Sequence, residues 1–261
     1  MVKGLQRFRD HFREFRDSFV VIGGVACDEW LGQQGLRFRP TRDVDMVLVL
    51  EALTPAFVAR VWEFVRAGRY DSRQRSTDKR IYYRFSKPAE PDFPAMIEIF
   101  SRQPSNLDLA AGQEVVPITP DDELSSLSAI LMDDAYYRLI LDCKALSNDL
   151  PIITAAALIP LKARAWLDLT RRRQDGIPVD DHDIRKHRRD VFRLTAALPA
   201  GAGPAIAESV RADLRRFVAA FTLDSPEWPD LLKSLKADLG AAVPRPEDLL
   251  AALDAYFSLG R

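Results

Sequence analysis

The chain has 261 residues, which is enough for one large domain or two small ones with a sizeable buried core. Hydrophobic residues make up 47% and charged residues 29%, which excludes disorder as the main state. The 37 Lys and Arg residues balance 38 Asp and Glu residues, which excludes a protein with a large net positive charge. Locally basic faces remain compatible with this balance.

The cysteines and the apolar runs indicate where the chain resides. Cys27 and Cys143 are too few and too far apart for a disulfide framework or a cysteine zinc site, which fits a reducing compartment. The start of the chain lacks the apolar run of a signal peptide. The longest apolar stretches, 19–27 and 155–161, are shorter than the roughly 20 residues of a membrane helix. We therefore expect a cytoplasmic protein that does not interact with a membrane.

The N-terminal segment has a helical pattern. Apolar residues recur at spacings of three and four from Leu5 to Phe19, with arginines on the other faces. Such a helix packs its apolar face into a core or lies on a membrane surface, and the acids between its arginines favour the core.

Helical and strand patterns alternate over the first 100 residues and predict a small α/β or α+β domain with a mixed sheet. The expected elements after the first helix are a strand at 19–22, a glycine turn, a helix at 25–34, a strand at 43–50, a helix from Pro55 capped by Thr54, and strands at 80–85 and 95–100. From Asp121 onward strands become scarce, and five helices are expected at 158–173, 183–198, 205–221, 226–239 and 246–259.

Asp43 and Asp45 are the most informative pair of residues. They are two positions apart on the expected strand and therefore point to one face, while Val44 and Met46 point to the core. Two adjacent carboxylates repel each other unless a cation lies between them, and Mg²⁺ prefers such oxygen ligands. The alternative is that both side chains are simply solvated at the end of a strand.

The residues before this pair offer donors for an anion. Gly23 and Gly24 form a strand-to-helix turn at which backbone N–H groups can approach a phosphate closely, although such a turn is often purely structural. Arg39, Thr41 and Arg42 then place guanidinium and hydroxyl groups directly before the carboxylates. The combination is more specific than any of its parts.

This combination resembles the nucleotidyltransferase superfamily, which has the DNA polymerase beta-like fold. In that family a Gly-Gly or Gly-Ser turn opens a helix, and an Arg-x-Ser/Thr-x segment precedes a strand that carries Asp-x-Asp. The residues that match are Gly23, Gly24, Arg39, Thr41, Asp43 and Asp45. The family adds a third carboxylate from a neighbouring strand, expected here at Glu98, with Asp92 and Asp108 as rivals. Glu98 alternates with apolar residues, so the exposed face of an edge strand is the other interpretation.

Segments 158–169 and 183–194 resemble the AbiEii-type branch of this superfamily, which includes bacterial abortive-infection and type IV toxin proteins. The resemblance implies that Lys162 reaches the nucleotide triphosphate and that Asp190 orients Lys162 or a nearby arginine. Alternatively, Lys162 extends from an apolar helix to water, and Asp190 forms a surface ion pair with Lys186 or Arg193.

Two charged segments allow further interpretations. The acids from Asp180 to Asp183 are typical of a helix N-terminus and favour capping over metal binding. Eight Lys or Arg residues between Arg171 and Arg193 form either an RNA-binding face or a solvated one.

The resemblance implies an α+β chain with two parts. Residues 1–150 form a nucleotidyltransferase-like α/β domain with a small mixed sheet flanked by helices, and residues 151–261 form a helical domain that completes the nucleotide cleft. The implied ligands of Mg²⁺ or Mn²⁺ are Asp43, Asp45 and Glu98, and the implied nucleotide-binding residues are Gly23, Gly24, Arg39, Thr41, Arg42 and Lys162.

The resemblance also implies a reaction. A nucleoside monophosphate is transferred from an NTP to an acceptor hydroxyl, and pyrophosphate leaves. The acceptor stays open between tRNA or another RNA, as for a toxin with a cognate antitoxin, and a small molecule or protein side chain. A nucleotide-binding or partner-binding module without turnover is the third interpretation.

Overall fold

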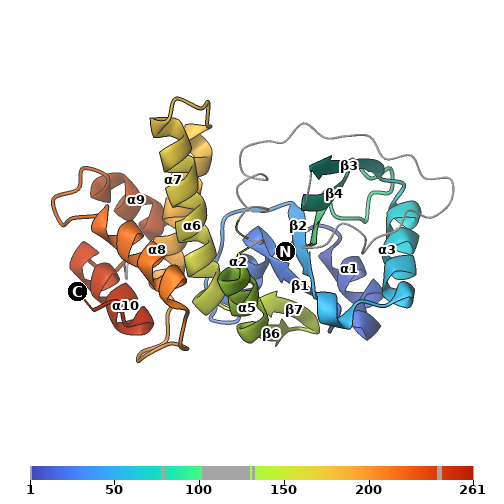
Figure 1. The fold of residues 1–261 in the computed structure, drawn as a ribbon, viewed down its shortest axis with the longest axis horizontal. Coiled ribbons are helices and arrows are strands. Elements are labelled where there is room, and N and C mark those ends of the chain that lie inside the picture. Colours follow the sequence, from blue (N-terminus) through green and yellow to red (C-terminus); the bar gives the residue numbers. More distant parts are fainter. Residues whose placement is uncertain (1, 78–79, 102–129, 131–132, 240–242, 261) are drawn as a thin grey trace. The chain divides into compact units, whose positions relative to one another are not determined.

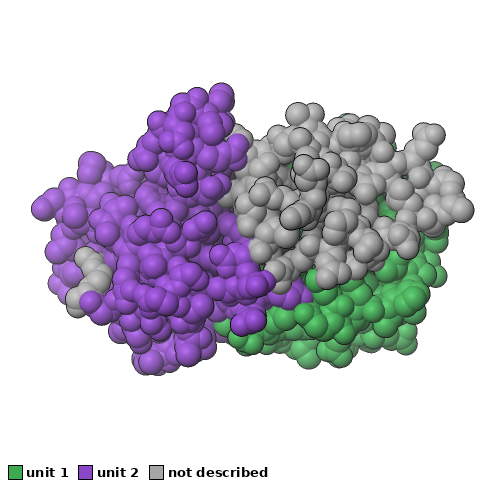
Figure 2. Space-filling model, viewed as in Figure 1, with its two compact units in different colours: residues 1–29, 40–120, 140–153 green, residues 30–39, 121–139, 154–261 purple. Residues whose placement is uncertain are grey.

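A computed structural model describes residues 2–77, 80–101, 130, 133–239 and 243–260 (Figure 1). The chain forms two compact units, which are coloured separately in Figure 2. Unit 1 comprises Met1–Glu29, Pro40–Pro120 and Ile140–Ile153, and unit 2 comprises Trp30–Arg39, Asp121–Leu139 and Thr154–Arg261.

Unit 1 is built on a mixed sheet of seven strands in the order β3-β4-β5-β2-β1-β7-β6. The strands are β1 (Phe19–Ile22), β2 (Asp43–Leu48), β3 (Asp71–Thr77), β4 (Arg80–Ser86), β5 (Met96–Ser101), β6 (Lys144–Ser147) and β7 (Leu150–Ile153). The β2–β5 and β1–β7 pairs are parallel, and the other neighbours are antiparallel. This sheet with its helices confirms the predicted α+β class.

Helices α1 (Leu5–His11) and α3 (Pro55–Gly68) pack on one face of this sheet through aromatic rings. The ring centroids of Phe8 and Phe64 are 5.6 Å apart, and those of Phe19 and Phe57 are 6.0 Å apart. Phe8 is fully buried, so the core interpretation of the N-terminal pattern is confirmed. Thr54 caps α3 as predicted by accepting a hydrogen bond from the Phe57 N–H at 3.2 Å.

The predicted N-terminal helix is too long. After α1 ends, a short 3₁₀ turn (Arg13–Phe15) precedes β1, and Phe19 already pairs with Leu48 across β1 and β2. The helical spacing of Phe15 and Phe19 continues past the end of the helix because both aromatic rings pack on Phe57, one from a turn and one from a strand.

Within the described residues, the sequence patterns did not predict four of the strands and α-helices: β3, helix α5 (Asp134–Asp142), β6 and β7. The last two form a hairpin around Asn148 and Asp149, whose φ angles of 46° and 69° suit a tight two-residue turn. Each strand has four residues, which is too short to give a period, and every residue of β7 is buried. Burial on both faces removes the alternation that identifies a strand.

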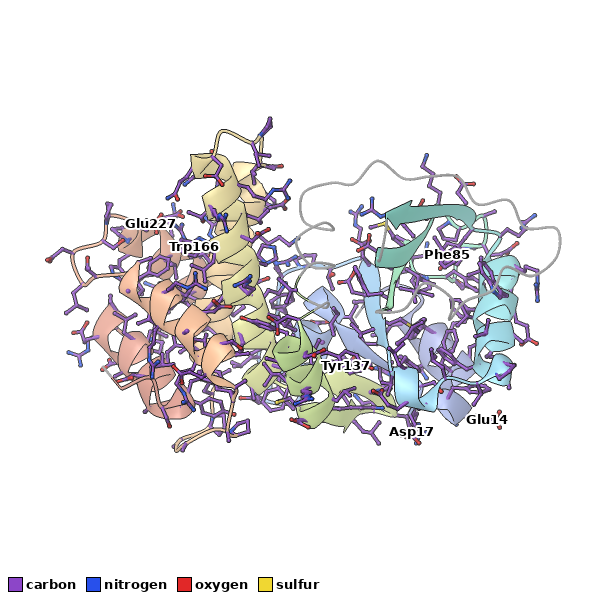
Figure 3. The ribbon with its side chains drawn as sticks, viewed as in Figure 1. Glu14, Asp17, Phe85, Tyr137, Trp166 and Glu227 are labelled. Atoms are coloured by element: carbon purple, nitrogen blue, oxygen red, sulfur yellow. The ribbon has the colours of Figure 1, made fainter. Side chains whose placement is uncertain are left out.

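Unit 2 contains the five predicted helices with shifted ends. They are α6 (Ala155–Gln174), α7 (Asp181–Thr195), α8 (Glu208–Ala219), α9 (Trp228–Leu239) and α10 (Pro246–Phe257). Trp166 on α6, labelled in Figure 3, packs on Phe217 at 5.2 Å and Phe221 at 5.3 Å between ring centroids. Phe192 on α7 lies 5.0 Å from Trp228 in the same core. None of the helices in the described ranges is long and apolar enough to cross a membrane.

Candidate active site

Two carboxylates of β2 lie on the face of the sheet that α1 and α3 do not cover. Val44 and Met46 are fully buried on the side that packs beneath the aromatic cluster, as the alternation predicts. Asp43 and Asp45 alternate with them and therefore point to the opposite face, where both are half-buried.

The third carboxylate is directly opposite Asp45. In the parallel pairing of β2 with β5, Asp45 stands in register with Glu98, so both side chains lie on one face. Strand β5 lies between β4 and β2, and Glu98 is only 7% exposed. The alternative of an exposed residue on an edge strand is therefore wrong.

Asp45, Glu98 and Arg84 form a row of charged groups across three strands. Arg84 on β4 stands in register with Glu98, and its Nε donates a hydrogen bond of 2.6 Å to Glu98 Oε1. Glu98 also shares a hydrogen bond with Asp45. Burial and the negative charge of Asp45 raise the pKa of Glu98 well above its usual value, and Arg84 opposes this shift. A cation between these two carboxylates would offset the repulsion between them.

Gly23 is required where it stands because Asp45 lies against it. Its φ of +65° favours glycine, and a Cβ built on it would lie 1.9 Å from Asp45 Oδ2. At Gly24 a Cβ would lie 2.5 Å from Thr41 Oγ1. Gly23 begins helix α2 (Gly23–Gly32), so the predicted strand, glycine turn and helix are present. The turn brings the Asp45 carboxylate and the Thr41 hydroxyl close to the backbone at a helix N-terminus.

Gly23→Ala is expected to displace the Asp45 carboxylate. It should lower the free energy of unfolding by more than the ~1–2 kcal/mol of left-handed backbone strain alone, and it should reduce any metal-dependent turnover. Gly35→Ala is the matched control, because Gly35 has a φ of +72° but nothing within 4 Å of a Cβ. Urea unfolding of both variants measures the difference. Equal losses in the two variants would show that Asp45 does not depend on this glycine.

A second charged cluster lies in unit 2 around Asp190, which is completely buried on α7. Lys162 Nζ on α6 is 3.3 Å from Asp190 Oδ2. Arg39 donates from Nε and Nη2 to the two Asp190 oxygens at 3.2 and 3.0 Å, and Arg193 donates from Nη1 to Oδ1 at 2.9 Å. Burial acts to raise the pKa of Asp190, but these three cations outweigh it and lower the pKa to about 2.

The two alternatives for this cluster, a solvent-exposed Lys162 and a surface ion pair of Asp190, are wrong. Lys162 is 7% exposed and contacts Asp190, so it does not extend to water. Asp190 pairs with Arg193, but in the interior rather than on the surface. The structure places the Arg39 guanidinium on Asp190, whereas its sequence context suggested a phosphate. Arg42 is exposed.

The remaining candidates are structural or lie apart from these groups. Asp180 caps α7 by accepting a hydrogen bond from the His182 N–H at 2.8 Å, as expected. The side chain of Asp92 is 77% exposed, and Asp108 lies outside the described residues. The described part of the chain contains no group of three His, Cys, Asp or Glu side chains already gathered for a metal. The carboxylates in contact are Asp45 and Glu98, with Asp43 beside them on β2.

Acidic residues of α9 and of the loop before it pair with several arginines of the basic segment, which runs from Arg171 to Arg193. Arg189 donates to Asp230 at 2.7 Å, Arg188 pairs with Glu227, and Arg193 donates from Nε to Asp238 at 2.9 Å. These pairs fasten α7 to α9 and favour a structural role for this part of the face.

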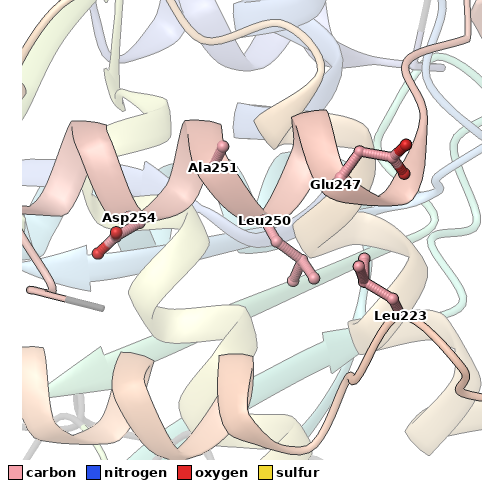
Figure 4. Close-up of a pocket in the computed structure, with 5 residues that line it drawn as sticks. All are labelled: Leu223, Glu247, Leu250, Ala251 and Asp254. Carbon is pink, nitrogen blue, oxygen red and sulfur yellow. The ribbon is translucent and has the colours of Figure 1, made fainter.

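A surface pocket of unit 2 contains none of the predicted residues. It has a volume of about 270 Å³ and is lined by Leu223, Glu247, Leu250, Ala251 and Asp254 (Figure 4). The pocket is lined by residues of α10 and by the exposed Leu223.

The chain is similar in structure to nucleotidyltransferase-like proteins. An antigenic nucleotidyltransferase-like protein from Paracoccidioides brasiliensis aligns with a TM-score of 0.43 and 15% identity, over 98% of this chain and 95% of that one. Cid1 in complex with its short product ApU aligns with a TM-score of 0.28 and 11% identity, and a cytoplasmic RNA terminal U-transferase with 0.29 and 10%. Both of these alignments cover 77% of this chain and 49% of the other. No protein-family model and no curated protein matches the sequence.

Proposed function

We propose that the chain is a metal-dependent nucleotidyltransferase that uses an NTP and releases pyrophosphate. The observation that carries the proposal is the pair of the half-buried Asp45 and the buried Glu98 on adjacent parallel strands, beside the Gly23 turn. Perturbed carboxylates of this kind are concentrated at functional sites, because their mutual repulsion is unfavourable for the fold alone.

The side chains fit Mg²⁺ or Mn²⁺ by their chemistry. Asp43, Asp45 and Glu98 offer only carboxylate oxygens, which these ions prefer, and a cation bound between them would offset the repulsion from Asp45 that helps raise the pKa of Glu98. These three residues would hold the ion. When bound, the ion neutralises triphosphate charge and polarises the acceptor hydroxyl for attack on the α-phosphorus.

The other residues bind and orient the nucleotide. Gly23 and Gly24 supply backbone N–H groups at the start of α2 for phosphate oxygens, and Thr41 adds a hydroxyl beside them. The Arg42 guanidinium is exposed and available for phosphate. Arg84 donates a hydrogen bond to Glu98 Oε1 and so restrains the orientation of that carboxylate beside Asp45.

In unit 2 the proposed phosphate-binding residue is Lys162. Its ammonium neutralises the charge that grows on the leaving pyrophosphate, and the ionised Asp190 holds it in place. Arg39 serves the same cluster, since its guanidinium contacts both Asp190 oxygens.

The proposal also names the molecule that accepts the nucleotide. The AbiEii-type resemblance of the segments around Lys162 and Asp190 supports tRNA, modified by a toxin that a cognate antitoxin restrains. Transfer to a small molecule or a protein side chain is the alternative. Arg171, whose side chain is 81% exposed although it pairs with Asp175, is the residue proposed to reach RNA phosphates.

A labelling experiment tests the function and the acceptor together. The purified chain is incubated with Mg²⁺ and each of the four α-labelled NTPs, with and without total tRNA. Label is expected to enter RNA with one preferred base, and to disappear when Mg²⁺ is chelated. Label on the protein or on an added small molecule would support the alternative acceptor. The absence of both label transfer and pyrophosphate release would contradict the proposed function.

A further inference from the structure

Arg193 connects Asp190 to a helix that carries none of the predicted residues. It lies on α7, one turn after Asp190, and is 3% exposed. Its Nη1 donates to Asp190 Oδ1 at 2.9 Å, while Nε and Nη2 both donate to Asp238 on α9, Nε at 2.9 Å. A guanidinium is planar and rigid, so these bonds fix its orientation at both ends.

The ring of Phe38 adds a further restraint on this group. The Arg193 Cζ lies 5.3 Å from the centroid of Phe38, and the Arg39 Cζ lies 4.9 Å from the same centroid. Both guanidiniums that contact Asp190 are therefore packed on one aromatic ring that is 9% exposed. The arrangement restricts sliding of either guanidinium along the carboxylate.

The two oxygens of Asp190 face different partners. Oδ1 accepts from Arg193 and from Arg39 Nε, while Oδ2 accepts from Arg39 Nη2 and lies 3.3 Å from Lys162 Nζ. Rotation of the carboxylate would move Oδ2 away from Lys162, whose four-carbon stem has no rigidity of its own. The groups that hold Oδ1 therefore restrain the oxygen that contacts the ammonium of Lys162.

We propose that Arg193, supported by Asp238, is a positioning residue that fixes Lys162 through Asp190. The inference rests on the proposed role of Lys162 in binding the triphosphate. It assigns a function to α9, which would set the position of a phosphate-binding group without contacting the nucleotide.

The same two helices provide a matched control. Arg189 lies one turn before Arg193 on α7 and donates to Asp230 on α9 at 2.7 Å. This pair has the same chemistry and joins the same helices, but its side chains are 30% and 55% exposed. If these pairs only fasten α7 to α9, substitutions in either pair should have similar effects on turnover. If Arg193 positions Lys162, only substitutions of Arg193 and Asp238 should lower turnover.

The kinetic test uses Arg193→Lys and Asp238→Asn in the full chain, with Arg189→Lys and Asp230→Asn as controls. Lysine keeps the charge but cannot bridge two carboxylates. Arg193→Lys is expected to lower kcat/KM for the NTP by about 10- to 100-fold, and Asp238→Asn by roughly 5-fold, since small displacements of a positioned group are costly. The Mg²⁺ concentration for half-maximal rate is expected to stay within about twofold, because its proposed ligands lie on β2 and β5.

A second readout is independent of turnover. Acylation of Lys162 by acetic anhydride, followed by mass spectrometry, is expected to be slow in the wild type and at least ~5-fold faster in Arg193→Lys, but unchanged in Arg189→Lys. If the wild type transfers no nucleotide, the proposed function fails, while faster acylation still supports the positioning of Lys162. Equal acylation and equal kinetics in Arg193→Lys and Arg189→Lys would overturn the inference.

Discussion

Asp45→Asn is expected to lower nucleotidyl transfer by at least about 10³-fold, or ~4 kcal/mol of transition-state stabilisation, while the protein remains as stable as the wild type or becomes more stable. The two effects have one cause. Asp45 is the negative charge that helps raise the pKa of Glu98, so removing it relieves the repulsion on the buried Glu98 as it removes a proposed metal ligand. Pyrophosphate release and urea unfolding measure the two quantities.

Asp92→Asn is the control for this substitution, because the Asp92 side chain is 77% exposed and is expected to change neither quantity. A structural role for Asp45 predicts the reverse pattern, with loss of stability. Turnover that survives in Asp45→Asn would contradict the assignment of the metal ligands.

Asp190→Asn is expected to lower the free energy of unfolding by about 3–5 kcal/mol, because it leaves the cations of Lys162, Arg39 and Arg193 in the interior without their carboxylate. It should also lower turnover through the loss of an ordered Lys162. Asp230→Asn breaks an exposed pair and is expected to cost about 0–1 kcal/mol.

The pH dependence of stability gives a second measurement of the same group. The pKa of Asp190 is about 2 in the folded protein, below its usual value of 3.8. Its contribution of roughly 2 kcal/mol is therefore complete above about pH 4 and is lost as the pH falls through 2. Urea unfolding between pH 5 and 2 should show a steeper loss in the wild type than in Asp190→Asn. Parallel curves would mean that Asp190 is not held ionised by its neighbours.

The sequence predicts the carboxylate face well because that face depends on local geometry. Alternation along β2 is enough to place Asp43 and Asp45 opposite the buried Val44 and Met46. The strand–glycine–helix order around Gly23 follows from the same local patterns. Glu98 was expected only from the resemblance, since nothing in the sequence specifies which residue of β5 stands opposite Asp45.

The contacts that depend on register or on tertiary packing were not predictable. Arg84 alternates on its strand like any other charged residue, and only the β4–β5 register places it on Glu98. Arg39 is 151 residues from Asp190 in the sequence, so their hydrogen bonds leave no local signal. The motif around Arg39 suggested a phosphate partner because motif reasoning considers only neighbouring residues.

Asp45 and Glu98 are proposed to hold a divalent ion together with the nucleotide. Water-proton relaxation during a titration with Mn²⁺, in the presence of a non-hydrolysable NTP analogue, reports the ion bound to the protein. We expect at least one bound Mn²⁺ in the wild type, an affinity lower by ~10-fold or more in Asp45→Asn and Glu98→Gln, and no change in Asp92→Asn. Equal Mn²⁺ binding in all four proteins would contradict this proposal.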